Sequence, residues 1–117
     1  DTPSTEENSV PVVAGTTIDI VSVVGAGTLS TEVVVIRHVG EGEINLAGWT
    51  IKDENGNTFN FPQLELYKGG SVQVHTSSGS NTVVDLYWGL RDPVWESGEI
   101  ARLFDGSGEL HAIYNIP

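Results

Sequence analysis

The chain has 117 residues, no cysteine, and 16 acidic residues against 5 lysine or arginine residues, which gives a formal net charge of −11. This length fits one domain and allows a hydrophobic core without crosslinks. The lack of cysteine excludes disulfides, thiolate chemistry and cysteine-ligated metal sites. The negative charge disfavours nucleic acid as a partner, because nucleic acids bind through cationic neutralisation of their phosphates.

The apolar runs are all far shorter than the roughly 20 residues that a membrane-spanning helix needs, so we expect no membrane insertion. Residues 1–9, DTPSTEENS, are small, polar and acidic, which is typical of a flexible tail or an interdomain linker. We therefore expect a single domain at residues 10–117. The proline within residues 10–13 favours an edge strand or an extended lead-in over a central strand.

Two runs rich in β-branched residues follow. Thr16–Val24 carries apolar residues on both parities, which predicts either a bulge that changes the face or a strand buried on both sides. Glu32–Val39 contains continuous valine and isoleucine, which predicts a central strand covered on both faces until Arg37 and His38 reach solvent. A helix is disfavoured here, because consecutive β-branched residues lose rotamer freedom in one.

The stretch Gly42–Pro62 contains the signals of a complete β-hairpin. Trp49, Thr50 and Ile51 alternate between apolar and polar, as a half-buried strand should. The pair Asn55-Gly56 favours a type I′ turn. Residues 58–61 then alternate again, with Phe59 and Phe61 on the core side, and Pro62 ends the strand because it has no N–H to donate.

The rest of the chain predicts further short strands near residues 71–75, 82–86, 100–104 and 110–114. The last two are joined by the glycine-rich turn at 105–109. In total we expect about seven to nine short strands at the close spacing typical of a sandwich or barrel. No stretch has a sustained helical period. We therefore predict an all-β fold, an immunoglobulin-like β-sandwich.

Several motifs occur in an order and spacing that are specific together, although each is short. They are the valine-rich strand and turn at 33–42, NLAGWTI at 45–51, FNFP at 59–62, residues 66–70, residues 95–98, and RLFD at 102–105. Over roughly residues 16–116 the chain resembles a lamin tail domain. This immunoglobulin-like module is found in nuclear lamins and, in many bacteria and archaea, within secreted or surface multidomain proteins.

The resemblance implies a sandwich with Trp49 and Trp95 in its core, beside Phe59 and Phe61. It implies no catalytic residue and no cofactor, because the family is a binding and tethering module. The nuclear members contact chromatin through basic surfaces. This acidic chain does not match those surfaces, so we do not expect nucleic acid as a partner.

The other candidate sites have structural explanations that we favour. His38, His75 and His111 lie singly on different predicted strands, without metal-binding spacing, and are expected at exposed strand positions. The acidic segments 53–57 and 105–109 are interpreted as hairpin turns, with weak surface calcium binding as the alternative. Pairs of glutamates such as Glu96 and Glu99 arise by chance among 16 acidic residues and are expected to be solvated surface groups.

The loop around Tyr87, Trp88 and Arg91 is the main candidate binding site. Two large aromatic side chains and a cation in a loop are typical anchors of protein interfaces and of sugar-stacking platforms. The competing interpretation is that Trp88 folds back to cover one end of the sandwich.

We therefore expect a non-catalytic interaction or tethering module of a larger exported or cell-surface protein, which binds a protein or surface partner through loops or edge strands. The first alternative is a carbohydrate-binding module that uses Tyr87 and Trp88. The second is a structural spacer that self-associates through edge strands.

Overall fold

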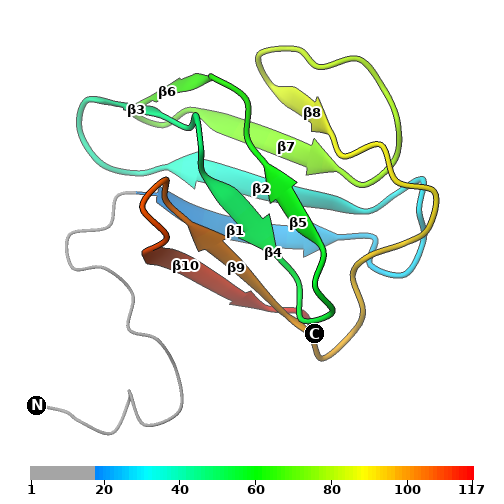
Figure 1. The fold of residues 1–117 in the computed structure, drawn as a ribbon. Coiled ribbons are helices and arrows are strands. Elements are labelled where there is room, and N and C mark those ends of the chain that lie inside the picture. Colours follow the sequence, from blue (N-terminus) through cyan, green and yellow to red (C-terminus); the bar gives the residue numbers. More distant parts are fainter. Residues whose placement is uncertain (1–17) are drawn as a thin grey trace, which may run out of the picture.

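The computed structural model describes residues 18–117, which form an all-β sandwich (Figure 1). The predictions for residues 1–9 and 10–13 lie outside the described residues. Within this range the chain forms ten strands and no helix. The strands are β1 (Ile18–Val24), β2 (Val33–His38), β3 (Glu43–Asn45), β4 (Thr50–Lys52), β5 (Thr58–Asn60), β6 (Glu65–Tyr67), β7 (Ser71–His75), β8 (Asp85–Tyr87), β9 (Ile100–Phe104) and β10 (Leu110–Asn115).

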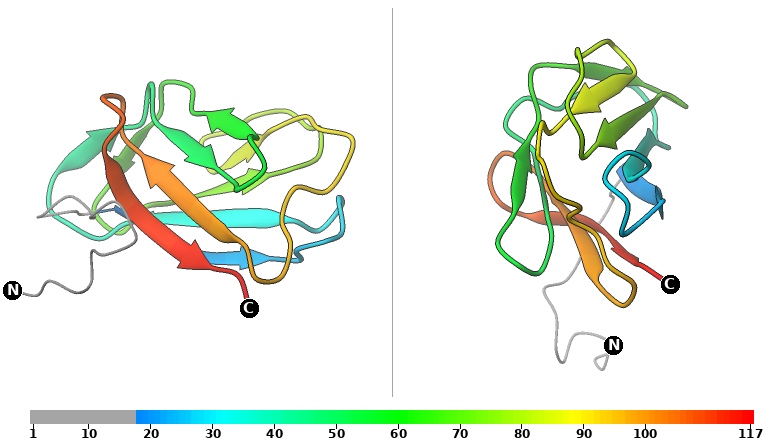
Figure 2. Two further views of the ribbon diagram at one scale, coloured as in Figure 1. Left: turned by 60° about the horizontal axis from the view of Figure 1, so that its bottom comes forward. Right: turned by 90° about the vertical axis from the view of Figure 1, so that its right-hand side faces the viewer.

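Two four-stranded sheets, ordered β1-β2-β7-β8 and β10-β9-β4-β5, pack face to face as two layers (Figure 2). Strands β3 and β6 pair with each other as a separate ribbon. Neighbouring strands are antiparallel except β7 and β8, which are parallel. The predicted all-β immunoglobulin-like sandwich is confirmed. Its described part has ten strands, more than the expected seven to nine, because short pairs such as β3 and β6 give weak sequence signals.

Strand β1 changes its buried face at a bulge. Its register with β2 shifts between Ile20 and Ser22. Ile18 and Ile20 are buried before the shift and Val23 is buried after it. The bulge therefore explains the apolar residues on both parities and confirms the first of the two alternatives for this run.

Strand β2 is central, between β1 and β7, but only one of its faces is fully covered. Val34 and Ile36 are completely buried, whereas Val33 and Val35 on the opposite face are half-buried. The prediction of burial on both faces is wrong, because the second sheet of a sandwich covers only the inner face of the first.

His38 is completely buried, so the prediction that it reaches solvent is also wrong. It lies two residues after Ile36 and therefore on the inward face of β2. Its Nε2–H donates to the Gly42 carbonyl oxygen at 2.9 Å, which satisfies the ring in its buried position. Arg37, on the opposite parity, is exposed.

The hairpins β4–β5 and β9–β10 end in loops of the same construction, at residues 53–57 and 105–109. In each loop the first residue is an aspartate, whose carboxylate accepts the backbone N–H of the second and fourth residues after it. Gly56 and Gly108 take the left-handed position, with φ of 93° and 91°. No described residue other than glycine has a positive φ. The predicted type I′ turn is therefore wrong, because it needs a positive φ at Asn55 as well.

The ends of these hairpins hold carboxylates in opposite electrostatic environments. The Ser107 hydroxyl and the backbone N–H of Glu109 donate to Asp105 and hold its pKa well below the usual range. Burial raises the pKa of Glu99, although its carboxylate accepts the Glu96 N–H at 2.9 Å. The negative charge of Asp53 raises it further. Glu99 is only 7% exposed, so its expected place among solvated surface acids is wrong.

Glu32 is a buried carboxylate that ties three loop segments to the start of β2. It is 1% exposed. One oxygen accepts hydrogen bonds from the Thr76 hydroxyl (2.8 Å) and the Val94 N–H (2.9 Å). The other accepts from the N–H groups of Gly27 (2.8 Å) and Trp95 (3.1 Å). A carboxylate is costly to bury unless such donors surround it. The four hydrogen bonds therefore hold both the Glu32 side chain and the loop segments that carry the donors.

We expect the Glu32→Gln variant to unfold with about 3 kcal/mol less free energy than the wild type, because an amide nitrogen would face buried N–H donors that need an acceptor. Chemical denaturation followed by tryptophan fluorescence measures this difference. The Glu109→Gln variant removes the same charge from an exposed side chain and is expected to change stability by less than about 0.5 kcal/mol. Equal stabilities of the two variants would contradict a structural role for the buried carboxylate.

The two shifted carboxyl groups predict opposite pH dependences. Folding raises the pKa of Glu99, so its ionised form weakens the folded state and protonation relieves that cost. The stability of the wild type relative to Glu99→Gln should therefore increase as the pH falls from neutral to about pH 4. Folding lowers the pKa of Asp105, so the advantage of the wild type over Asp105→Asn should be complete above about pH 5 and shrink as the pH falls below it.

Free energies of unfolding, measured for the three proteins across this pH range, test both signs together. The comparison with each variant cancels the titration of all other groups. Two differences that change in the same direction would contradict the assignment.

Candidate functional site

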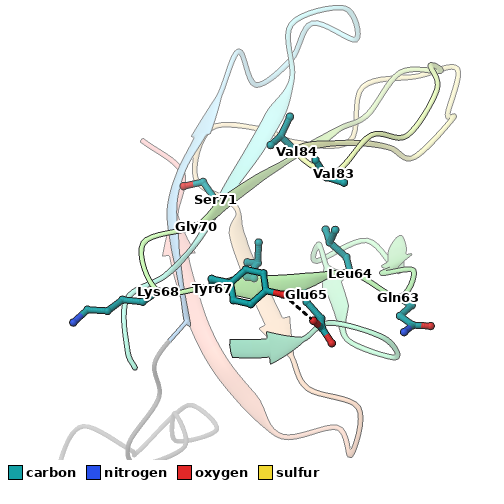
Figure 3. A pocket seen from close by; sticks show the side chains of 10 residues that line it. Gln63, Leu64, Glu65, Tyr67, Lys68, Gly70, Ser71, Val83 and Val84 are labelled. Atoms are coloured by element: carbon teal, nitrogen blue, oxygen red, sulfur yellow. Dashed lines mark hydrogen bonds between the residues drawn. The ribbon is translucent and has the colours of Figure 1, made fainter. Parts of the chain in front are cut away.

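An open groove of about 660 Å³ lies beside β6, and we call it the β6 groove (Figure 3). Strands β6 and β7 diverge from the turn at 68–70, which forms its closed end together with Ser71. Val83 and Val84, just before β8, form the opposite wall. The lining residues are Gln63, Leu64, Glu65, Leu66, Tyr67, Lys68, Gly70, Ser71, Val83 and Val84.

The β6 groove gathers large apolar side chains that are exposed to solvent. Val83 is 74% exposed, Tyr67 59% and Val84 51%, whereas Leu66 is buried at the base. Single exposed apolar residues are common on protein surfaces, but a group of them around one hollow indicates a contact surface. The β6 groove is therefore suited to bind an apolar segment of a partner.

Three glutamates, Glu41, Glu43 and Glu65, lie on or just before the β3–β6 ribbon, and we call them the acidic rim; Glu65 is the one that lines the β6 groove. The Tyr67 hydroxyl donates to Glu65 at 3.2 Å, and this bond raises the pKa of Tyr67. The negative charges of Glu65 and Glu43, which lies opposite Tyr67 in the β3–β6 register, raise it further. Lys68, the cation among the residues that line the groove, forms an ion pair with Glu41. The rim therefore carries a net negative charge.

Tyr87, proposed from the sequence as a binding residue, ends β8 instead of lying in a loop. Its ring stacks on the His75 ring, with centroids 4.6 Å apart and planes 13° from parallel. His75 Nε2 donates in turn to Asp85 at 2.8 Å. One face of the tyrosine is thus covered by a histidine that is itself held by a carboxylate.

Trp88 and Arg91, the other two proposed binding residues, have different surroundings. Trp88 is half-buried, and its ring centroid lies 5.7 Å from that of Phe59 and 6.2 Å from that of Trp95. Phe59 also contacts Phe61 edge to face. These four rings form a continuous aromatic cluster in the interior, with Trp95 completely buried. Arg91 is exposed and lines a smaller hollow of about 220 Å³.

The remaining candidates are Trp49, which lies just before β4, and His111, which lies on β10. Trp49 is 8% exposed and its ring centroid is 4.7 Å from that of His111. His111 Nε2 donates to Asp105 at 2.8 Å. The three histidines are therefore far less exposed than expected, and each is held by a local hydrogen bond. Within residues 18–117 no group of three or more histidine or acidic side chains is placed to hold a metal ion.

Sequence reasoning missed the β6 groove because it assigned Val83 and Val84 to a strand beginning at Thr82. Strand β8 begins only at Asp85. The Thr82 hydroxyl accepts the backbone N–H groups of Val84 (3.1 Å) and Asp85 (2.9 Å), which holds this segment in a turn. The sequence signal was present, since two adjacent valines directly follow a long polar loop.

A search for helices that could cross a membrane finds none in the described part of the chain. No curated protein gives a significant match to the sequence. The family model of the Lamin Tail Domain matches residues 11–117, a range that includes all ten described strands. This match agrees with the immunoglobulin-like sandwich and with the resemblance carried by the sequence motifs, and the chain belongs to the Lamin Tail Domain family.

Proposed function

We propose that this domain is a non-catalytic protein-interaction module and that its partner docks in the β6 groove. The observation that carries the proposal is the exposure of Val83, Val84 and Tyr67 around one hollow. Families with this immunoglobulin-like fold are typically non-catalytic and serve as interaction or structural modules. The groove offers apolar contact area and an acidic rim, which are the elements of a specific protein interface.

The groove supports this function better than the loop around Trp88 does. Trp88 shares its ring contacts with Phe59 and Trp95, so it contributes to the aromatic cluster of the interior. The valines of the β6 groove have no comparable role, because most of their side-chain surface is in solvent. Solvent-exposed apolar area that contributes little to folding is available for binding.

We further propose that the domain works within a larger exported or cell-surface protein. Membership of a family that, in many bacteria and archaea, occurs within secreted or surface multidomain proteins supports this context. The polar, acidic composition of residues 1–9 supports it too, because such segments commonly link domains. In this setting the module tethers the rest of the protein to its partner.

The proposal predicts that peptides selected from a random library for binding to this domain will need Val84 for their affinity. We would select peptides from a displayed random library on the immobilised domain and measure their affinity for the Val84→Asp variant. We expect affinity to fall by about tenfold or more, because a charge would be placed at the centre of an apolar contact.

The matched control is Val24→Asp, since Val24 on β1 has the same 51% exposure as Val84 and does not line the groove. Binders should keep their affinity for this control. Selected peptides that bind the wild type and both variants equally would contradict docking in the β6 groove.

A further inference from the structure

We infer that the ligand of the β6 groove is an extended peptide segment with alternating apolar and basic side chains, which adds as a new strand to the outer edge of β6. This inference rests on the proposed function, because it specifies the partner of the same groove. Three independent features carry it: the backbone groups of β6, the alternation of its side chains, and the charge of the rim.

The backbone of β6 has hydrogen-bonding groups directed into the groove. The Leu46 N–H donates to the Leu64 carbonyl at 2.8 Å, so this pair is hydrogen-bonded across the ribbon. Hydrogen-bonded and non-bonded pairs alternate in an antiparallel ladder, so the peptide groups of Glu65 and Tyr67 point away from β3. The Tyr67 carbonyl accepts the Gly70 N–H at 2.7 Å.

Three backbone groups of β6 are therefore available to an incoming strand. They are the N–H and carbonyl of Glu65 and the N–H of Tyr67, which have no backbone partner in the part of the chain that the structure describes. An exposed edge of this kind is a template for an extended peptide. The open space between β6 and Val83–Val84 leaves room for that peptide (Figure 3).

The side chains of β6 determine what an added strand would need on each face. Leu66 points inward and is buried, whereas Glu65 and Tyr67 point outward and are exposed. Side chains of an added strand lie beside those of β6 on the same face. The inward residues of the peptide would therefore contact Leu66 and the valine wall, which favours apolar side chains.

On the outward face the peptide would lie beside the acidic rim. Glu65 and Glu43 flank Tyr67 there, and the ion pair with Glu41 already uses the positive charge of Lys68. Lysine or arginine at the outward positions complements this charge. A second copy of the chain is a poor occupant by the same reasoning, because it would bring its own acidic rim and a net charge of −11.

The test uses a short peptide in which lysine and valine alternate, titrated into the full chain and followed by backbone-amide NMR. We expect localised shifts at Glu65, Tyr67 and Val84, and slower hydrogen exchange of the first two amides. A peptide of alternating glutamate and valine should bind about tenfold or more weakly, because it repels the rim. The lysine–valine peptide with N-methylated backbone amides should lose a similar factor, because it cannot form the ladder.

Charge reversal at the rim provides a reciprocal test. The Glu65→Lys variant, an exposed substitution, should weaken binding of the lysine–valine peptide and strengthen binding of the glutamate–valine peptide. The Glu109→Lys variant, which makes the same change at the β9–β10 turn, should leave both affinities within about twofold of the wild type, because separated surface charges are screened by salt.

The outcomes separate this inference from the proposed function. Library peptides that need Val84 but bind as helices, or that bind equally well when acidic, would overturn the inference and leave the interaction module intact. Protection of the β6 amides by dimerisation of the peptide-free chain would overturn it in favour of a second copy. If every selected binder kept its affinity for the Val84→Asp variant, both the inference and the proposed function would be contradicted.

Discussion

The rest of the fold depends on the buried carboxylate of Glu32. Its two oxygens collect hydrogen bonds from Gly27, Thr76, Val94 and Trp95, which belong to segments far apart in the sequence. If any of those segments moved away, the buried carboxylate would lose part of its hydrogen-bond donors, which is costly in the interior. The hydrogen bonds of Glu32 therefore fix the backbone that carries Trp95. Through Trp95 they also position the aromatic cluster of Trp88, Phe59 and Phe61.

The same use of a carboxylate as a backbone acceptor recurs locally at Asp53 and Asp105. Each closes its own hairpin loop by accepting N–H groups two and four residues further along the chain. Some acidic residues of this chain therefore stabilise the fold, and do not serve only to keep the protein in solution. Other acids, Glu43 and Glu65 among them, lie on the surface of the ribbon, where their negative charges act on Tyr67.

The features that the sequence predicted correctly are those decided by near neighbours. Strand 71–75 follows from simple alternation after a glycine turn, and the two hairpins follow from loop residues next to their strands. The errors concern environments created by distant segments. His38 is buried where β2 meets the Gly42 segment and the turn at 69–70, which bond its ring and its backbone. Tyr87 joins β8 through a parallel pairing with β7.

The site was hard to predict for the same reason. The wall formed by Val83 and Val84 depends on the Thr82 hydroxyl, which accepts the N–H groups of Val84 and Asp85 and delays the start of β8. The other wall exists because β6 pairs with β3 and not with its neighbour in sequence, β7. The groove lies between β6 and the segment before β8, which do not pair with each other. The sequence of neither segment indicates that a hollow forms between them.

Hydrogen bonds within the chain hold both ends of the β6 groove. His38 holds the closed end, because its backbone bonds Gly69 and Gly70 while its ring bonds Gly42 at the start of the ribbon. The bond between Leu46 and Leu64 holds the other end of β6. A strand edge fixed at both ends loses little conformational freedom when a peptide pairs with it. The buried histidine, which the sequence placed in solvent, therefore helps to preorganise the groove that we propose as the docking site.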